Sequence, residues 1–522
     1  MTEPAPDLPR PIVLLVRWGS PALMVSLLMR LWVIFASGNY DWDMDHEMYF
    51  GQRLLGGDLI WTKEFHDKLP FVQMLFSVPA AFDSIQAWRI LSLFSVTLGA
   101  ALIVILVPRI LHIPNVAYSD VRRLSLFAAL LYASLTASLP GDLTHINPMA
   151  GAFALSATLL MLWAGQMPVT RIRVIFAAGL LAAAAISIRP YLLAPLVLTA
   201  LLGCFAPISG PHPRRLSERL ALFGCLGVVT LVSGLVLNLL PYALSGHMAA
   251  FWAGLSMLAQ DINPQYFGDT FLDSLNLSNP LVIPFWAISL AGIAVFATGV
   301  RRGSISARFI LMILIAQCSL FAFVAQKHWW PHYLNFFTGY SCLMMLGILV
   351  WLAERRVRFP VTGMLVMSLG LAGLVALATL WSARSLIRFT PAKHTYHPGP
   401  VIDAFQTYRE ASDAASIPFL SPSQIALHWN LKEPRHGFPH AANTEHINRG
   451  WWADVPPNKV FATPESPEAY CAFLQMQAPR LVVDISTSPV LPCLEQEGSR
   501  YRLDANVPIA GRSATLVVFR RM

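Results

Sequence analysis

The sequence predicts a polytopic α-helical membrane protein with about eleven transmembrane helices, interfacial helices and a small extracytoplasmic α/β domain. Of its 522 residues, 55% are hydrophobic and only 13% are charged, and the mean hydropathy is +0.54. Soluble domains carry roughly 25% charged residues, so an ordinary soluble enzyme is excluded. Long apolar windows separated by short arginine clusters indicate the same class. Residues 384–522 contain no window long enough to span a membrane, which predicts the terminal domain.

Apolar windows of about 17–25 residues can cross a bilayer as helices. The fifth and sixth windows are separated only by Arg189-Pro190, so they form either a helical hairpin or one long kinked segment. The first window follows no cleavable-signal pattern, so we expect it to stay as an anchor. The windows cover residues 13–37, 87–108, 123–140, 148–165, 172–188, 190–207, 220–242, 281–300, 307–325, 332–353 and 360–383.

Arginine placement predicts the orientation. Every second loop is rich in arginine, and the positive-inside rule places those loops and the N-terminus in the cytoplasm. The net charge of +8 is therefore a topology signal and does not indicate nucleic-acid binding. The residues concerned are Arg10, Arg17, Arg109, Arg122, Arg123, Arg171, Arg173, Arg214, Arg215, Arg219, Arg301, Arg302, Arg308, Arg355, Arg356 and Arg358.

The polar C-terminal region, 384–522, follows a membrane module that covers residues 1–383. Its short apolar runs at 480–485 (RLVVDI) and 514–519 (ATLVVF) predict buried strands. This region lies on the outer face in the predicted topology, so Cys471 and Cys493 meet an oxidising compartment and we expect them to pair. The other four cysteines lie in or beside apolar windows and are expected to be small core residues.

The stretch 41–70 is the most unusual part of the chain. Asp41, Asp43, Asp45 and Glu47 fall within seven residues of an otherwise charge-poor protein, directly after the first span. Carboxylates so close together repel one another, which favours either a functional site or a solvated loop that caps the span. An amphipathic helix is predicted to follow and to end at Gly56-Gly57. Residues 71–80 are apolar but too short to cross a membrane, which favours an interfacial helix.

Two short motifs resemble a known family. Residues 45–58 read DHEMYFGQRLLGGD and residues 67–70 read DKLP. This pattern resembles the first outer loop of GT-C glycosyltransferases, polytopic enzymes of the protein O-mannosyltransferase and lipid A aminoarabinose transferase kind. The resemblance implies a bacterial inner-membrane enzyme that takes a sugar from a polyprenyl phosphate on the periplasmic face. The order of parts is also similar: first span, outer loop 38–86 with interfacial helices, helical bundle, extracytoplasmic domain.

The resemblance also implies roles for individual residues. Asp45 matches the catalytic aspartate, a general base that removes the acceptor hydroxyl proton. Glu47 or Asp43 would orient the acceptor or hold a divalent cation, Mg or Mn. Lys68 matches the lysine of the family's K-P-P pattern, although Leu69 stands where the first proline is expected.

A polyprenyl-phosphate leaving group requires positive charge at the outer interface. The segment 327–333 (KHWWPHY) offers this charge, and His332-Tyr333 matches an H-Y pair of the family. Aromatic residues and a flanking lysine are also ordinary interfacial anchors. Arg189 is a second source of charge, or else the partner of a carboxylate. The predicted donor-phosphate contacts are thus Lys68, Arg189, Lys327, His328, His332 and Tyr333.

Two further outer segments carry candidate acceptor or sugar contacts. The loop 140–148 contains Asp142, His145 and Asn147, and the loop 243–280 contains Trp252 and Tyr266. The first reads equally as a plain polar loop, and the second as an interfacial helix with a turn.

The predicted function is therefore transfer of a sugar from a polyprenyl-phosphate donor to a glycan, lipid or protein acceptor. A transporter or flippase of lipid-linked sugars is the competing class, and it would favour internal inverted repeats, which the sequence does not display convincingly. A non-catalytic membrane scaffold with a periplasmic binding domain is a third possibility.

Overall fold

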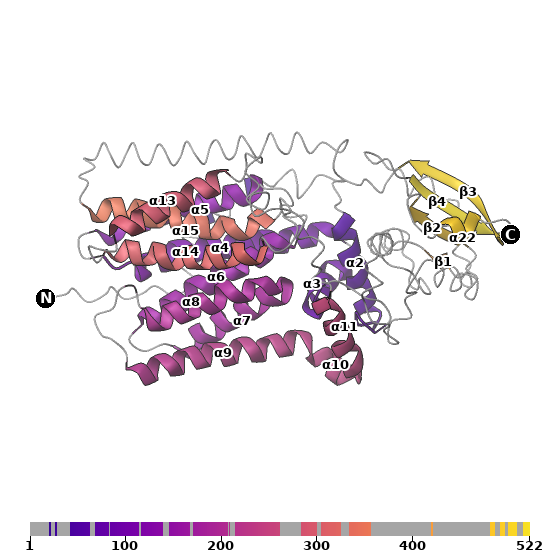
Figure 1. Ribbon diagram of the computed structural model, residues 1–522, viewed down its shortest axis with the longest axis horizontal. Coiled ribbons are helices and arrows are strands. Elements are labelled where there is room, and N and C mark those ends of the chain that lie inside the picture. The colour runs from indigo at the N-terminus through magenta and orange to yellow at the C-terminus, as the bar shows by residue number, and fades with distance from the viewer. Residues whose placement is uncertain are drawn as a thin grey trace. The chain divides into compact units, whose positions relative to one another are not determined.

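The computed structural model contains a helical bundle, a group of shorter helices and a small sheet (Figure 1). The chain forms two compact units. One unit contains residues 89–237 and 263–386, and the other contains residues 35–88, 238–262 and 387–522. The residues that the structure describes are 20, 21, 24, 27, 28, 42–62, 68–82, 84–113, 116–138, 146–167, 171–206, 208, 215–260, 283–299, 304–324, 333–355, 419–420, 481–485, 491–495, 499–508 and 515–522.

The bundle is built from long apolar helices that lie alongside one another (Figure 1). The helix α6 is its centre and packs against α7, α8 and α15, while α15 also packs against α5, α13 and α14. In α6, 89% of the apolar window is buried, against 11% in α9. The bundle helices are α4 (Ile85–Ile110), α5 (Tyr118–Ser138), α6 (Asn147–Gln166), α7 (Ile172–Ile188), α8 (Leu193–Phe205), α9 (Leu216–Asn238), α13 (Ile283–Gly299), α14 (Ile305–Val324) and α15 (Leu334–Glu354).

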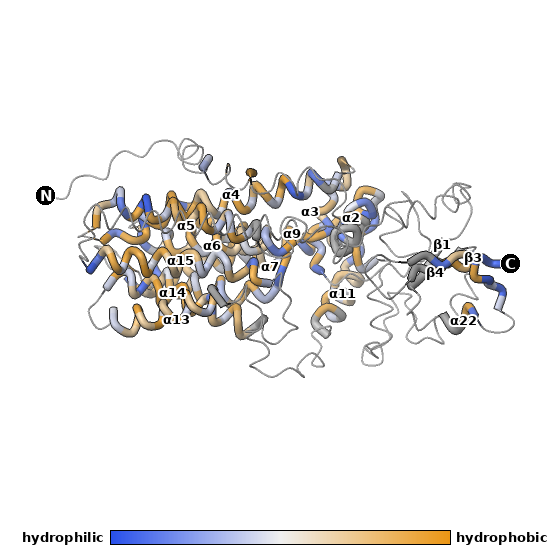
Figure 2. Tube along the Cα trace, turned by 90° about the horizontal axis from the view of Figure 1, so that it is seen from above, coloured by the Kyte–Doolittle hydropathy of each residue, from blue (hydrophilic) through white to orange (hydrophobic). Residues whose placement is uncertain are grey.

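Five of these helices are long and apolar enough to cross a membrane: α4, α6, α9, α14 and α15. Figure 2 shows the hydrophobic colour continuing along the bundle helices. The predicted windows between 87 and 353 each coincide with a helix, or with a helix and a short turn, in the described residues. The windows 13–37 and 360–383 lie largely or wholly outside the described residues, so the count of eleven stays a prediction.

The segment around Arg189 is a helical hairpin, which decides between the two alternatives for this region. α7 ends at Ile188, Arg189 is extended, and a 3-10 turn, η1 (Pro190–Leu192), leads into α8. The start of α6 is bonded to Arg189, and a Cβ on Gly165 near the end of α6 would overlap the backbone of Gly203 in α8. α6 and α8 therefore run parallel and α7 runs back, so one long kinked segment is wrong.

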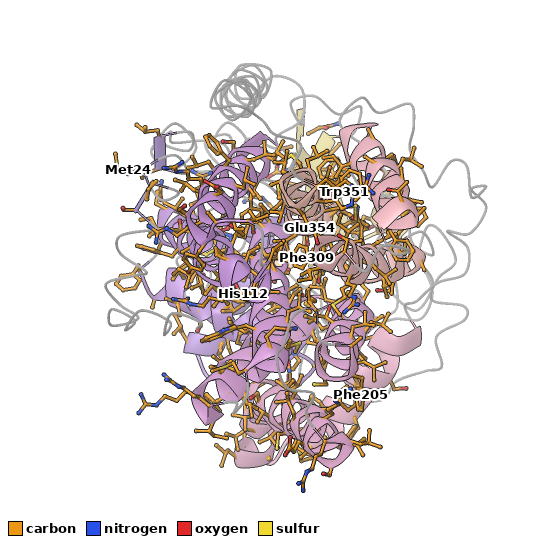
Figure 3. The ribbon with its side chains drawn as sticks, turned by 90° about the vertical axis from the view of Figure 1, so that its left-hand side faces the viewer. Met24, His112, Phe205, Phe309, Trp351 and Glu354 are labelled. Carbon is orange, nitrogen blue, oxygen red and sulfur yellow. The ribbon has the colours of Figure 1, made fainter. Side chains whose placement is uncertain are left out.

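Among the described residues, three of the arginines that set the predicted orientation, Arg109, Arg219 and Arg355, lie at one end of the bundle. Arg109 at the end of α4 lies 6.0 Å from the Trp163 ring near the end of α6. Arg219, in the first turn of α9, donates to the carbonyl of Phe205 at the end of α8. At the same end Glu354 closes α15, and Figure 3 shows it beside Trp351 and Phe309. Its carboxylate accepts hydrogen bonds from Ser304 Oγ (2.6 Å) and Ile305 N (3.2 Å), which caps α14.

The short helices of the second unit form two pairs. α2 (Trp42–Leu55) packs against α3 (Pro70–Ala81), and α10 (Leu240–Ser245) lies against α11 (Met248–Gln260). The helix α2 ends as predicted, since Gly57 takes a positive φ of 91° and its N–H donates to the carbonyl of Leu54. In the region 243–280, residues 248–260 form α11 and residues 261–280 lie outside the described residues, so both interpretations of this region stay predictions.

The described C-terminal residues of the second unit contain a four-stranded sheet in the order β1-β2-β4-β3. β1 and β2 are parallel, and the other neighbours are antiparallel. The two predicted strands are found as β2 and β4, and β3 was not predicted. Cys493 is disulfide-bonded. Cys471 lies outside the described residues, so its pairing stays a prediction, as does the boundary at 383/384. The strands and helix are β1 (Phe419–Leu420), β2 (Leu481–Ile485), α22 (Leu491–Glu495), β3 (Tyr501–Pro508) and β4 (Thr515–Arg521).

Candidate functional site

The acidic stretch is helical rather than a loop. Asp43, Asp45 and Glu47 all lie in the first half of α2, which begins at Trp42. Carboxylates are favoured near a helix N-terminus because the unpaired N–H groups and the helix dipole are positive there. The side chain of Glu47 is buried, with 4% exposed. The side chains of Asp43 and Asp45 lie outside the described part of the structure.

The end of α2 is tied back to the loop that follows it. Arg53 Nη2 lies 2.6 Å from a carboxylate oxygen of Asp58, and both side chains are mostly buried. The N–H of Asp58 also donates to the carbonyl of Arg53, at 2.9 Å. The motif residues 53–58 therefore close the helix and turn the chain toward α3.

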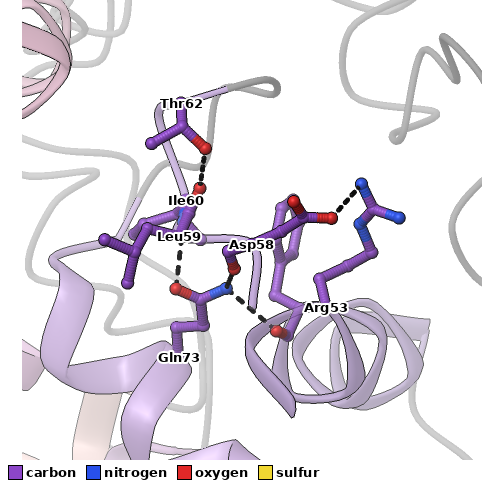
Figure 4. A network of polar contacts seen from close by, with 7 residues as sticks. Arg53, Asp58, Leu59, Ile60, Thr62 and Gln73 are labelled. Atoms are coloured by element: carbon purple, nitrogen blue, oxygen red, sulfur yellow. Dashed lines mark hydrogen bonds and ion pairs between the residues drawn. The ribbon is translucent and has the colours of Figure 1, made fainter. Parts of the chain in front are cut away.

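Gln73 joins α3 to α2 and to the same loop (Figure 4). Its Nε2 donates to the carbonyls of Phe50 (3.0 Å) and Asp58 (2.9 Å). Its Oε1 accepts from the N–H of Ile60 (3.0 Å). The side chain is only 1% exposed, so these are buried bonds that water does not replace.

An aromatic cluster holds the loop from the other side. Trp61 is fully buried at a positive φ of 65° and packs with Tyr242 and Phe251 at centroid distances of 6.3 and 5.8 Å. The Tyr242 hydroxyl donates to the carbonyl of Ile60. This cluster packs α10 and α11 against the loop after α2, although the two segments are far apart in the sequence. The candidate sugar contact Trp252 lies on α11 beside it, with 55% exposed.

Lys68 lies two residues before α3 and is half-buried. The first free N–H of α3, that of Phe71, donates to Asn238 Oδ1 at 3.1 Å. The lysine of the predicted K-P-P match therefore stands at a helix start that a distant asparagine fixes. The departure at Leu69 does not prevent the helix, because Pro70 still occupies its first position.

Arg189 lies at the end of the bundle opposite the arginine clusters. Its Nε donates to Asn147 Oδ1 at 2.8 Å, across the start of α6 and the α7–η1 junction. Asn147 is fully buried. The partner in this contact is a neutral amide, whose oxygen accepts from the guanidinium and helps to orient it. The sequence predicted Arg189 as a phosphate contact and Asn147 as an acceptor contact. The structure shows that these two residues are hydrogen-bonded to each other.

Three aromatic rings cluster at the same end of the bundle. Tyr191 in η1 contacts Tyr333 and Phe336 at centroid distances of 6.0 and 5.3 Å. The start of α15 also lies against α6, because a Cβ on Gly151 would come within 2.8 Å of the Asn335 carbonyl oxygen. The predicted residues Arg189, Asn147 and Tyr333 therefore belong to one end of the bundle.

Sequence reasoning missed several buried polar groups. Gln73 is one, and its signal was an amide within an otherwise apolar twelve-residue helix. The hydroxyl of Tyr191 is buried and has no hydrogen-bond partner among the described residues. Arg89 in α4 is 1% exposed. A charge inside an apolar window is a functional-site signal, the same one that drew attention to Arg189.

Other predicted site residues lie outside the described residues, and no metal-binding group of His, Cys, Asp or Glu is found within the described part. The positions concerned are Asp142, His145, Tyr266, Lys327, His328 and His332.

Comparison with solved structures shows which known proteins share this fold. No protein-family model matches the sequence, and no curated protein matches it. Two similar solved structures are of ArnT from Cupriavidus metallidurans, one bound to undecaprenyl phosphate and one in the apo state. They are 14% and 15% identical to this chain, each with a TM-score of 0.56 and 97% of both chains covered. The chain therefore has the same fold as these two ArnT structures.

Proposed function

We propose that the protein is a glycosyltransferase that takes a sugar from a polyprenyl phosphate and passes it to a glycan, lipid or protein acceptor. The observation that carries this proposal is the fold similarity to ArnT bound to undecaprenyl phosphate, which covers 97% of both chains. An agreement over the whole length, outer helices included, favours a shared reaction type more than agreement of a bundle alone would.

In the proposed reaction, the acidic helix α2 supplies the general base. Asp45 removes the proton of the acceptor hydroxyl while that oxygen attacks the anomeric carbon. The bond from the anomeric carbon to the phosphate oxygen breaks, and polyprenyl monophosphate leaves with the bonding electrons. Asp43 and Glu47 orient the acceptor or hold a divalent cation, Mg or Mn, that would stabilise the departing phosphate.

Positive charge near the phosphate stabilises the leaving group more than the ground state, because the departing monophosphate carries the larger charge. The orientation of Arg189 by Asn147 supports a fixed cation of this kind. We propose donor-phosphate contacts at Lys68, Arg189, Lys327, His328, His332 and Tyr333, and sugar or acceptor contacts at Asp142, His145, Asn147, Trp252 and Tyr266.

The proposed location is the bacterial inner membrane, with the N-terminus in the cytoplasm and the site and C-terminal domain in the periplasm. The gathering of Arg109, Arg219 and Arg355 at the end of the bundle opposite Arg189 supports this orientation.

The test is mass spectrometry of surface glycans in a deletion strain, with complementation by wild type and by Asp45→Asn. We expect one sugar to disappear, wild type to restore it and Asp45→Asn to fail, while the purified variant still binds undecaprenyl phosphate. Asp120→Asn is the matched control, because Asp120 lies at the start of α5 and pairs with Arg123 at 3.7 Å. It should restore the sugar fully.

Other results of these experiments would refute parts of the proposal. Full restoration by Asp45→Asn would refute the base assignment. Purified protein in detergent should transfer the sugar, whereas a transporter would leave it on its lipid. An unchanged glycan profile together with no binding of undecaprenyl phosphate would refute the function.

A further inference from the structure

One buried side chain, Gln73, controls where the acidic helix lies. Its amide donates to the Phe50 carbonyl, one helical turn after Glu47. The same amide group holds the Asp58 carbonyl and the Ile60 N–H, so the end of α2 and the following loop are fixed from one point on α3.

A carboxamide is suited to this place. It presents two donors and one acceptor on a planar group, and here both donors and the acceptor are used. Leucine or methionine of similar length offers none of them, and glutamate offers only acceptors when ionised. Glutamate would therefore keep the Ile60 contact and face two carbonyl oxygens with negative charge.

Close packing restricts the positions that α2 can take against α3. Gly51 follows Phe50 in α2, and a Cβ at this position would overlap the backbone carbonyl of Phe76 in α3. Phe50 itself is 2% exposed and belongs to the cluster of Trp61, Tyr242 and Phe251. The two helices therefore touch at backbone level, and the Gln73 bonds select the position along that contact.

We infer that Gln73 is a positioning residue for the carboxylates of α2. Its side chain is buried, and it acts by setting the position of the helix that carries Asp43, Asp45 and Glu47. The inference rests on the proposed glycosyl transfer. Misplacing a reacting group by about 1 Å can cost on the order of 10²-fold in rate without a matching loss of binding.

The test compares Gln73→Leu and Gln73→Glu with Gln86→Leu in the full-length protein. Gln86 at the start of α4 is a matched glutamine outside the network, and within the described residues its Oε1 accepts from Ser84 Oγ at 3.2 Å. Two quantities are measured: the sugar restored in the deletion strain at equal protein level, and the affinity of the purified protein for undecaprenyl phosphate.

We expect both Gln73 variants to lose on the order of 10²-fold of sugar transfer while the affinity for undecaprenyl phosphate changes by less than about threefold. Gln86→Leu should match wild type in both. The inference is overturned if Gln73→Leu and Gln73→Glu restore the sugar as well as Gln86→Leu. It is also overturned if affinity and transfer fall together, because that would indicate general loss of structure.

Hydrogen exchange separates this inference from the proposed function. In Gln73→Leu, exchange of residues 47–60 should rise while exchange of α11 stays as in wild type. Unchanged exchange of 47–60 would refute the positioning role even if wild type transfers sugar. If wild type transfers no sugar but exchange rises as expected, the proposed function fails and Gln73 still fixes α2.

Discussion

Removing one oxygen atom from Tyr191 should stabilise the protein. In the substitution Tyr191→Phe the ring keeps its contacts with Tyr333 and Phe336, at 6.0 and 5.3 Å. The hydroxyl is buried and has no hydrogen-bond partner among the described residues. A buried polar group without a partner costs about 1–3 kcal/mol relative to its hydrated state in the unfolded chain. We expect the free energy of unfolding to rise by about 1 kcal/mol, the lower end of that range.

Reversible unfolding by SDS in mixed micelles measures this change, and Tyr340→Phe is its matched control. The Tyr340 hydroxyl lies 3.2 Å from Thr158 Oγ1, and both residues are buried. Hydrogen bonds between membrane helices contribute about 0.6 kcal/mol on average, so this variant should be less stable by roughly that amount. Removing the hydroxyl should thus raise the free energy of unfolding at Tyr191 and lower it at Tyr340. A loss of stability in Tyr191→Phe as large as that in Tyr340→Phe would refute the reasoning.

Four further outcomes follow from other contacts. Gly51→Ala should lower the free energy of unfolding in the same SDS assay by about 1–3 kcal/mol, since a Cβ would overlap the α3 backbone. An unchanged free energy would show that α2 and α3 can move apart at little cost. Glu354→Gln should cost about 1 kcal/mol in that assay, because an ionised acceptor that receives two bonds becomes neutral; equal stability would show that the charge adds nothing. Burial raises the pKa of Tyr501 to about 12, so the folded protein keeps a proton that the unfolded chain loses above pH 10. The free energy of unfolding of wild type should therefore fall as the pH rises from 10 toward 12. In Tyr501→Phe this free energy should fall less between pH 10 and pH 12. Equal falls in wild type and variant would contradict this. Peptide mapping without reduction should yield Cys471 linked to Cys493, and a different partner for Cys493 would contradict the predicted pair.

Much of the helical fold was predictable because long apolar windows have few alternatives in a membrane protein. The helices α4 to α9 begin and end within a few residues of their predicted windows. The strand β3 was missed for a physical reason. It is an edge strand with a register shift between Leu503 and Ala505, and its sequence YRLDANVP lacks the apolar run that marked β2 and β4.

The candidate site was only partly predictable. The sequence predicted Arg189 and Asn147 as separate contacts, and their hydrogen bond depends on the hairpin that brings α8 parallel to α6. The acidic residues were expected in a loop because four carboxylates suggest solvent, and three of them instead occupy the favourable start of α2. Long-range partners such as Asn238 for Phe71 leave no local pattern in the sequence.

The parallel contact of α6 and α8 sets a limit on how this chain can change in length. The helices are joined at one end by Arg189 and Asn147 and at the other by the backbone approach of Gly165 to Gly203. One inserted residue between the two contacts on either helix would shift one end by about 1.5 Å and turn it by about 100°. Both joints could not then be kept. Insertions and deletions among descendants of this sequence should therefore fall in loops, and α6 and α8 should keep their lengths even where their side chains diverge.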